Sequence, residues 1–244
     1  MFDNPWEPLG HAMLDYHRGD TSAKIIVLCD LEDPLEEPLS TFFRDAANFS
    51  AIEKTAIGLC RGKVLDIGAG SGCHSLVLQE MGLDVAALDV IPQAIGIMKE
   101  RGVSDARLGD VFNFRVNDTG RFDTLLMMMN GIGIVGTLKG LRKFLIHAKK
   151  IMKPDGALVM DSNDLRSAVT PEEIAARLAS GPRAYFGEVR YQMQYKGVTG
   201  PPYWWLYIDR DMLEEMADKT GWIVESFFQT DEGSYLAKLI LKRA

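Results

Sequence analysis

The segment Lys63–Leu76 reads KVLDIGAGSGCHSL and indicates a binding loop. It joins a short apolar run to three glycines at alternate positions, and helix-forming residues follow. Glycines allow unusual backbone dihedral angles and a close approach of a ligand. A helix that begins at such a loop presents free N–H groups and the positive end of its dipole to that ligand. The segment therefore predicts a nucleotide-like ligand bound between a strand and a helix.

The sequence on both sides of this loop alternates between strand-like and helix-like segments. This alternation is typical of a parallel sheet with crossover helices. The expected strands are residues 63–68, 84–89, 106–109, 122–129 and 157–161. The expected helices are residues 71–81, 92–101 and 138–152.

The C-terminal part follows a different pattern. A helix is expected at 209–220, followed by two apolar segments, 222–228 and 235–241. The turn-rich connection between the two segments is too short for a crossover helix. These strands should therefore be antiparallel neighbours.

The composition limits the classes of function. The chain has 244 residues, of which 47% are hydrophobic and 25% charged, as in ordinary globular proteins. The net charge of −7 argues against a nucleic-acid partner. Cys29, Cys60 and Cys73 lack C-x-x-C spacing, so neither a disulfide framework nor a metal site is predicted. The start, MFDNPWEPLG, lacks a signal-peptide pattern, and no apolar run reaches the ~18 residues of a membrane span. We therefore expect a cytoplasmic protein.

Asp66 discriminates between the possible ligands of the loop. Dinucleotide-binding loops have the spacing G-x-G-x-x-G and hold a pyrophosphate. Here the glycines are Gly68, Gly70 and Gly72, and Cys73 stands where the third glycine of that motif would be. The Asp66 carboxylate would repel a pyrophosphate but would attract an ammonium group. This favours S-adenosylmethionine, which has an α-amino group and no phosphate.

VLDIGAGSG resembles the first motif of the class I, Rossmann-fold S-adenosylmethionine-dependent methyltransferases. The resemblance extends over residues 56–161 and from 209 to the end of the chain. It implies an α/β fold with a doubly wound, mostly parallel seven-stranded sheet. One antiparallel strand of the C-terminal pair would be inserted beside the fifth strand. The implied cofactor is S-adenosyl-L-methionine.

The resemblance also implies roles for individual residues. Asp89 in VAALDV would hold the ribose hydroxyls, and Asp110 in LGDVF would accept a hydrogen bond from the adenine amino group. Phe112 would help to flank the adenine. Each acid has an alternative role as a cap of the following helix. The predicted cofactor-binding residues are Arg44, Asp66, Gly68, Ala69, Gly70, Gly72, Asp89, Val90, Asp110, Val111 and Met129.

Three polar residues are candidates for the end of the site where the reaction occurs. His74 lies in the first turn of the helix after the loop, where the dipole keeps an imidazole neutral and available as a general base. Its alternative role is to complete the helix start or to contact the cofactor carboxylate. Asn130 ends the fourth strand and is placed to orient an acceptor. Arg44 would pair either with the cofactor carboxylate or with Asp45 and the neighbouring acidic loop.

Two stretches fall outside the alternation and are long enough to fold together as a small α+β cap over the carboxyl edge of the sheet. The predicted organisation is a cap segment and lead-in helix at 1–50, a cofactor-binding core at 51–161, a cap insertion at 162–208, and the end of the core at 209–244. Phe42 and Phe43 belong to the expected lead-in helix, and Thr170 begins a capping box. Most cap aromatics should pack in the cap, with one or two facing the cleft; they are Tyr191, Tyr195, Tyr203, Trp204, Trp205 and Tyr207.

These features together predict an S-adenosylmethionine-dependent methyltransferase that acts on a small molecule. An NAD(P)-dependent oxidoreductase is one alternative, because it shares the fold and the acid after the second strand. Asp66 and the missing third glycine count against it. The other alternative is a non-catalytic protein that binds S-adenosylmethionine and lacks an acceptor site.

Overall fold

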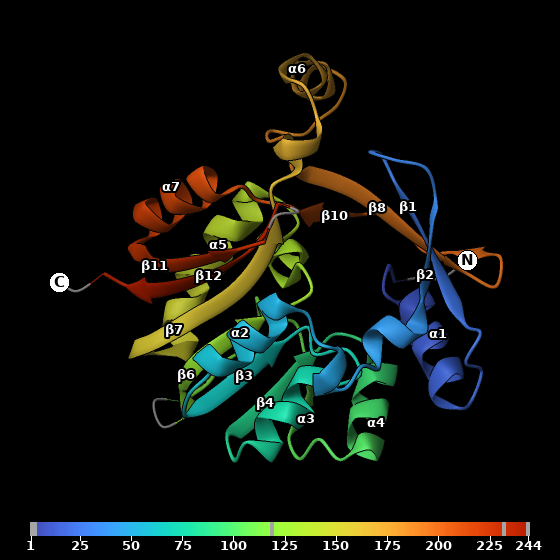
Figure 1. Cartoon of the computed structure of the whole chain (residues 1–244), viewed down its shortest axis with the longest axis vertical. Helices are drawn as coiled ribbons and strands as arrows, with labels where there is room; N and C mark the ends of the chain where they lie inside the picture. Colours follow the sequence, from blue (N-terminus) through green and yellow to red (C-terminus); the bar gives the residue numbers. More distant parts are fainter. Residues whose placement is uncertain (1–3, 118–119, 231–232, 243–244) are drawn as a thin grey trace.

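The computed structural model describes residues 4–117, 120–230 and 233–242, and its larger sheet has seven strands (Figure 1). These strands are β3 (Lys63–Ile67), β4 (Asp84–Asp89), β5 (Ala106–Leu108), β6 (Phe122–Met127), β7 (Met152–Asn163), β11 (Trp222–Gln229) and β12 (Ser234–Leu241). Their order is β11-β12-β7-β6-β3-β4-β5. Strand β12 is antiparallel to β7 and β11, and the other neighbours are parallel. The predicted fold class is confirmed.

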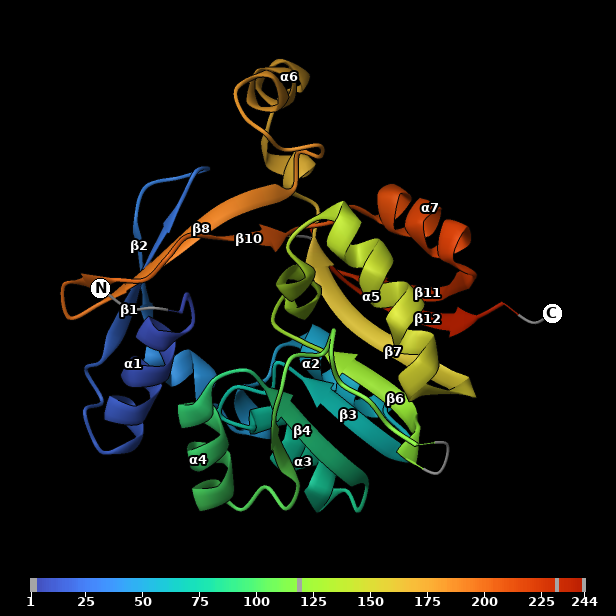
Figure 2. The ribbon, with the colours of Figure 1, turned by 180° about the vertical axis from the view of Figure 1, so that it is seen from behind.

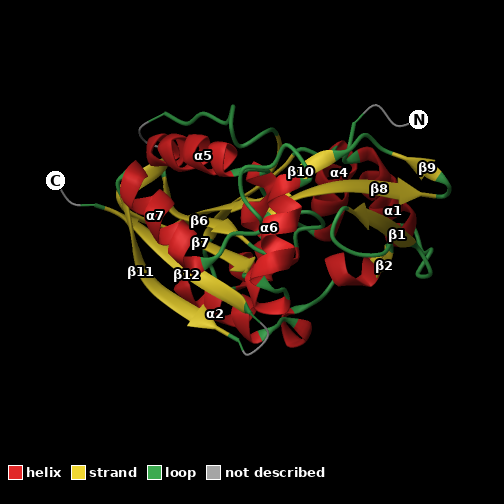
Figure 3. Ribbon diagram, turned by 90° about the horizontal axis from the view of Figure 1, so that it is seen from above, coloured by secondary structure: helices red, strands yellow, loops and turns green. Residues whose placement is uncertain are grey.

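Helices cover both faces of this sheet (Figure 3). They are α2 (Ala51–Leu59), α3 (Cys73–Glu80), α4 (Pro92–Arg101), α5 (Leu138–Ile151) and α7 (Arg210–Thr220). Alternation along the strands sends successive side chains to opposite faces. In β6, Leu125 packs in the cluster with α5 and α7, whereas Leu126 packs in the cluster with α2 and α3. The two buried faces explain the continuous apolar character of the parallel strands.

A second, smaller sheet combines residues from the two stretches that fall outside the alternation (Figure 2). Its strands are β1 (Lys24–Cys29), β2 (Leu35–Pro38), β8 (Glu188–Tyr195), β9 (Val198–Thr199) and β10 (Tyr203–Leu206). Strand β1 pairs with β8, and Val27 lies opposite Met193. Helix α1 (Glu7–His17) packs against α4, one of the helices that cover the larger sheet. Met13 of α1 and Ile97 of α4 belong to the same apolar cluster.

The N-terminal stretch differs from its predicted structure in three ways. The acidic, proline-containing loop includes strand β2, and Glu7–His17 forms a helix that the sequence analysis did not predict. The expected lead-in helix around Phe42–Arg44 is wrong: Leu39–Phe42 and Ala46–Asn48 form 3-10 turns instead. The helix begins only at Ala51, where Ser50 and Glu53 form a capping box.

Most other boundaries agree closely with the sequence, but β7 begins at Met152, five residues before the expected start of that strand. Helix α4 has the predicted bounds, and α6 (Pro171–Ala179) begins with the expected capping box at Thr170. Strand β6 ends at Met127, two residues earlier than predicted, and the residues that follow leave the extended conformation. Within the described ranges, no helix is both long and apolar enough to cross a bilayer.

Candidate active site

A cavity of about 310 Å³ lies at the carboxyl ends of β3, β4 and β6. Its walls also include side chains of α1 and β10, so elements of the smaller sheet region close one side. The predicted site residues in its wall are Asp66, Gly68, Ala69, Gly70, His74, Asp89, Val90, Asp110, Val111 and Met129. Arg44, Gly72 and Asn130 do not line it. Most of the predicted site is thus brought together around one volume.

The glycine loop forms an open cradle on one side of this cavity. Gly68 and Gly70 have φ values of +74° and +57°, which side chains rarely adopt. A Cβ atom added to Gly68 would meet no atom within 4 Å, so its missing side chain leaves room that a ligand can fill. Gly72 has a different reason to be glycine, because a Cβ atom there would lie 2.8 Å from Val103.

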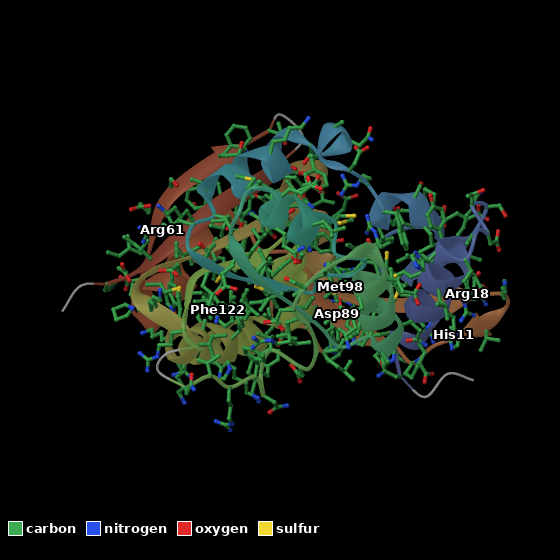
Figure 4. All side chains as sticks on the ribbon, turned by 90° about the horizontal axis from the view of Figure 1, so that it is seen from below. His11, Arg18, Arg61, Asp89, Met98 and Phe122 are labelled. Atoms are coloured by element: carbon green, nitrogen blue, oxygen red, sulfur yellow. The ribbon has the colours of Figure 1, made fainter. Side chains whose placement is uncertain are left out.

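Asp89 ends β4 and is buried beside the loop (Figure 4). Its Oδ2 accepts a hydrogen bond from the Gly70 N–H at 2.8 Å, and its Oδ1 accepts one from the Ile91 N–H at 2.9 Å. Burial raises the pKa of Asp89, although these N–H donors act in the opposite direction. Helix α4 has no side-chain cap, so Asp89 does not cap it. Each carboxylate oxygen can accept one further hydrogen bond, so Asp89 can bind two neighbouring hydroxyl groups of a ligand.

Asp66 and Asp110 occupy different environments in the same wall. Asp66 is 2% exposed, and the Ser75 hydroxyl donates a hydrogen bond to it at 2.6 Å. Burial raises the pKa of Asp66, so a cation beside it would stabilise its charged form. Asp110 is exposed at the rim, where it accepts a hydrogen bond from the Phe112 N–H at 2.9 Å. These carboxylate acceptors fit a ligand with an ammonium group at its buried end.

His74 belongs to a buried charged cluster that the sequence analysis did not anticipate. Its Nε2 lies 2.8 Å from Glu53 Oε1, and Arg44 binds both oxygens of Glu53 at 2.7 and 2.8 Å. Burial alone would raise the pKa of Glu53, but the hydrogen bonds from His74 and Arg44 lower it to about 2. Because Glu53 is therefore ionised and can only accept hydrogen bonds, we infer that the Nε2 atom of His74 carries a proton. The Nδ1 atom is then left to contact another group.

This cluster changes the expected environment of Arg44. The expected pairing with Asp45 is wrong, because Glu53 accepts hydrogen bonds from both terminal guanidinium nitrogens of Arg44. The only sequence signal for Glu53 was the Ser50-x-x-Glu53 capping pattern, which explains the helix start. Nothing in that pattern reveals the contact with His74, which lies on another helix.

Two residues after β6 have positive φ values although they are not glycines. Met129 has φ +63° and Asn130 has φ +53°, a conformation that costs about 1–3 kcal/mol per residue. The Asn130 amide donates a hydrogen bond to the Leu206 carbonyl of β10 at 3.3 Å, and its Oδ1 is buried without a partner. Asn130 therefore lies behind the cavity wall and connects the larger sheet to β10, whereas Met129 reaches the cavity.

Aromatic and aliphatic side chains of other segments also line the cavity. They are Trp6, Leu9, Phe42, Ile134 and Trp205. Trp205 packs directly on Gly133, where an added Cβ atom would lie 2.1 Å from the indole nitrogen. Trp205 is one of the six cap aromatics of which one or two were expected to face the cleft, whereas Trp6, Leu9 and Ile134 carried no recognisable signal.

The sheet order and the glycine cradle above a buried acid define a Rossmann-like cofactor-binding protein. A family model for the methyltransferase domain matches residues 65–160. The chain is 37% identical to a SAM-dependent methyltransferase from Bacteroides fragilis whose crystal structure contains S-adenosyl-L-homocysteine. That comparison covers 100% of this chain and 98% of the other, with a TM-score of 0.88. The chain belongs to the S-adenosylmethionine-dependent methyltransferases, and S-adenosyl-L-methionine is its cofactor.

More distant structures share the fold alone. The CcbJ methyltransferase from Streptomyces caelestis is 14% identical, covers 79% of this chain and 90% of its own, and has a TM-score of 0.61. A SAM-dependent methyltransferase from Methanosarcina mazei is 16% identical, covers 80% and 99%, and has a TM-score of 0.60. The oxidoreductase and the non-catalytic alternative find no support in these comparisons.

Proposed function

We propose that the protein transfers a methyl group from S-adenosylmethionine to a small molecule enclosed beneath the smaller sheet. One observation carries this proposal. The cavity that contains Asp66, Gly68 and Asp89 continues to Trp6 and Trp205 without an intervening wall. Donor and acceptor would therefore share one enclosed volume. Residues 1–50 and 162–208 would act together as the cap that closes it.

The cofactor would lie along the carboxyl edge of the sheet. Asp89 would accept hydrogen bonds from the ribose hydroxyls, and Asp66 would attract the ammonium group. Gly68 and Gly70 would allow close approach of the backbone, while Asp110 and Val111 would contact the adenine. The carboxylate positions and the open glycine cradle support these roles. When bound, S-adenosylmethionine supplies an activated methyl group.

The protein's contribution to the transfer is mainly alignment. Fixing two reactants in a productive geometry supplies ~7–11 kcal/mol of the barrier reduction. We propose that His74, oriented by Glu53, accepts a proton from the acceptor or orients it through Nδ1. Asn130 would contribute indirectly, because its hydrogen bond to Leu206 holds β10 against the end of β6.

Labelled cofactor tests the proposal. A cell extract is separated into small molecules and macromolecules, and each fraction is incubated with the protein and methyl-labelled S-adenosylmethionine. We expect label in the small-molecule fraction, and none when Asp66→Asn replaces the wild type. Label confined to protein or nucleic acid would contradict the proposal.

A further inference from the structure

The glycine loop that lines the cavity is held in shape by contacts from other segments. Ser71 stands between Gly70 and Gly72, which both have positive φ values. Glycines lose more conformational freedom than other residues when they are ordered, so a fixed loop needs contacts from outside. Asp89 supplies one such contact, because it accepts a hydrogen bond from the Gly70 N–H at 2.8 Å. Ser71 supplies a second attachment through both its backbone and its side chain.

Arg101, the last residue of α4, makes this attachment, although it does not itself line the cavity. Its Nη1 group donates hydrogen bonds to the Ser71 carbonyl oxygen, at 2.7 Å, and to the Ser71 hydroxyl. The guanidinium also lies 5.3 Å from the centre of the Phe43 ring, a distance at which a cation and an aromatic ring attract each other. Hydrogen bonds from a charged donor are stronger than those between neutral groups. A single cation therefore fixes Ser71 at two of its atoms.

The same contacts join the glycine loop to residues 39–48, the segment between β2 and α2, which we call the strap. The aromatic ring beneath the guanidinium belongs to the strap. In addition, the Phe42 carbonyl accepts hydrogen bonds from the Ser71 hydroxyl and from the Cys73 thiol, the latter at 3.0 Å. The side chain of Phe42 lines the cavity. Arg101 therefore lies where the glycine loop and the strap meet, and its contacts fix two parts of the cavity wall together.

We propose that Arg101 is a positioning residue for S-adenosylmethionine, because it holds the glycine loop and the strap in the shape that binds the cofactor. Cations are favourable at the end of a helix and unfavourable at its start. Helix stability thus accounts for Arg101 at the end of α4, but not for its guanidinium beside Ser71 at the start of α3. A loop that is already ordered loses less entropy when a ligand binds, which raises the affinity. This role concerns the cofactor and is independent of the methyl acceptor.

Two substitutions separate the hydrogen bonds of Arg101 from the packing of its side chain. Arg101→Met keeps an unbranched side chain without a donor, and should weaken the binding of S-adenosylhomocysteine about ten-fold in calorimetry. Arg101→Lys should stay within about three-fold of the wild type, because one nitrogen makes both bonds to Ser71 and an ammonium group can replace it. Lys99→Met is the matched control, since Lys99 is exposed on the same helix, and its affinity should stay within about two-fold.

Hydrogen–deuterium exchange of the full chain without cofactor gives a second readout. The amides of residues 70–74 should exchange several-fold faster in Arg101→Met than in the wild type, while those of β6 keep their rates. Addition of S-adenosylhomocysteine should restore the protection of the loop. Wild-type affinity in Arg101→Met, or equal weakening by the Met and Lys variants, would overturn the proposal. Unchanged exchange in the loop, or faster exchange throughout the chain, would also overturn it, since the latter would show a general loss of stability.

Discussion

The buried Glu53 carboxylate should make stability depend on pH in a way that can be measured without knowing the acceptor. The pKa of Glu53 falls from 4.5 to about 2 in the folded protein, because the hydrogen bonds from His74 and Arg44 outweigh the effect of burial. A shift of this size corresponds to ~3.4 kcal/mol at most. The Arg44 side chain is 22% exposed, so solvent screens the pair and we expect about 2–3 kcal/mol.

The sign of the effect follows from the direction of the shift. A carboxyl group whose pKa is lower in the folded state stabilises that state fully above its unfolded pKa, 4.5. This stabilisation is lost as the pH falls from 4.5 toward 2. Glu53→Gln removes the charge and should remove this pH-dependent contribution. The free energy of unfolding of the wild type should therefore exceed that of the variant by about 2–3 kcal/mol at pH 7. This difference should shrink below pH 4.5.

Urea unfolding followed by circular dichroism at several pH values between 7 and 2.5 measures this difference. The matched control is Glu100→Gln, because Glu100 also pairs with a histidine, His17, but its side chain is 69% exposed. That control should change the free energy of unfolding by less than about 1 kcal/mol. A Glu53→Gln deficit that stays constant over the whole pH range would refute the reasoning, since it would reflect packing and not charge.

Three further substitutions test the site and its support. Asp89→Ala should weaken binding of S-adenosylhomocysteine by about 1.5–3 kcal/mol in calorimetry, and an unchanged affinity would place the ribose elsewhere. Gly133→Ala places a Cβ atom 2.1 Å from the Trp205 indole nitrogen, so methyl transfer should be lost and tryptophan fluorescence should change; a variant with normal activity would contradict the packing. Gly72→Ala combines φ +83° with a contact 2.8 Å from Val103, and should lower the free energy of unfolding by about 1–3 kcal/mol in urea. An unchanged urea midpoint would argue against that strain.

The cofactor half of the molecule could be predicted because its signals are local. The glycine loop, the strand-end acid Asp89 and the helix at 92–101 are each encoded within a few residues, and the structure contains all three at the expected places. The antiparallel position of β12 was also predictable, because the short turn before it leaves no room for a crossover. The spacing of the hydrophobic residues and the length of the turns are enough to predict such elements.

The Glu53 cluster was not predictable for the opposite reason. Glu53, Arg44 and His74 are separated by 9 and 21 residues and meet only after α2 and α3 pack together. The capping box at Ser50 accounts for Glu53 only as part of the helix start, and nothing local in the sequence indicates its contact with His74. A similar limit applies to Asp161, which lies two residues before the end of β7. Its pKa is raised to about 6 by burial that depends on the elements around it, although the Asn130 and Gly131 N–H groups oppose the rise.

The smaller sheet shows how segments without a simple local pattern can still form part of the cavity wall. Strand β1 pairs with β8 across more than 160 residues, so no local pattern fixes the register. Once that sheet forms, α1 packs against α4 and brings Trp6 to the cavity from a segment whose sequence resembles a loop. The unusual backbone at Met129 and Asn130 fits this picture, because it turns the chain toward β10, and the bond from Asn130 to Leu206 partly offsets its cost. The wall formed by Trp6 and Trp205 is thus a product of long-range packing, which explains why the cofactor site is recognisable in the sequence and this wall is not.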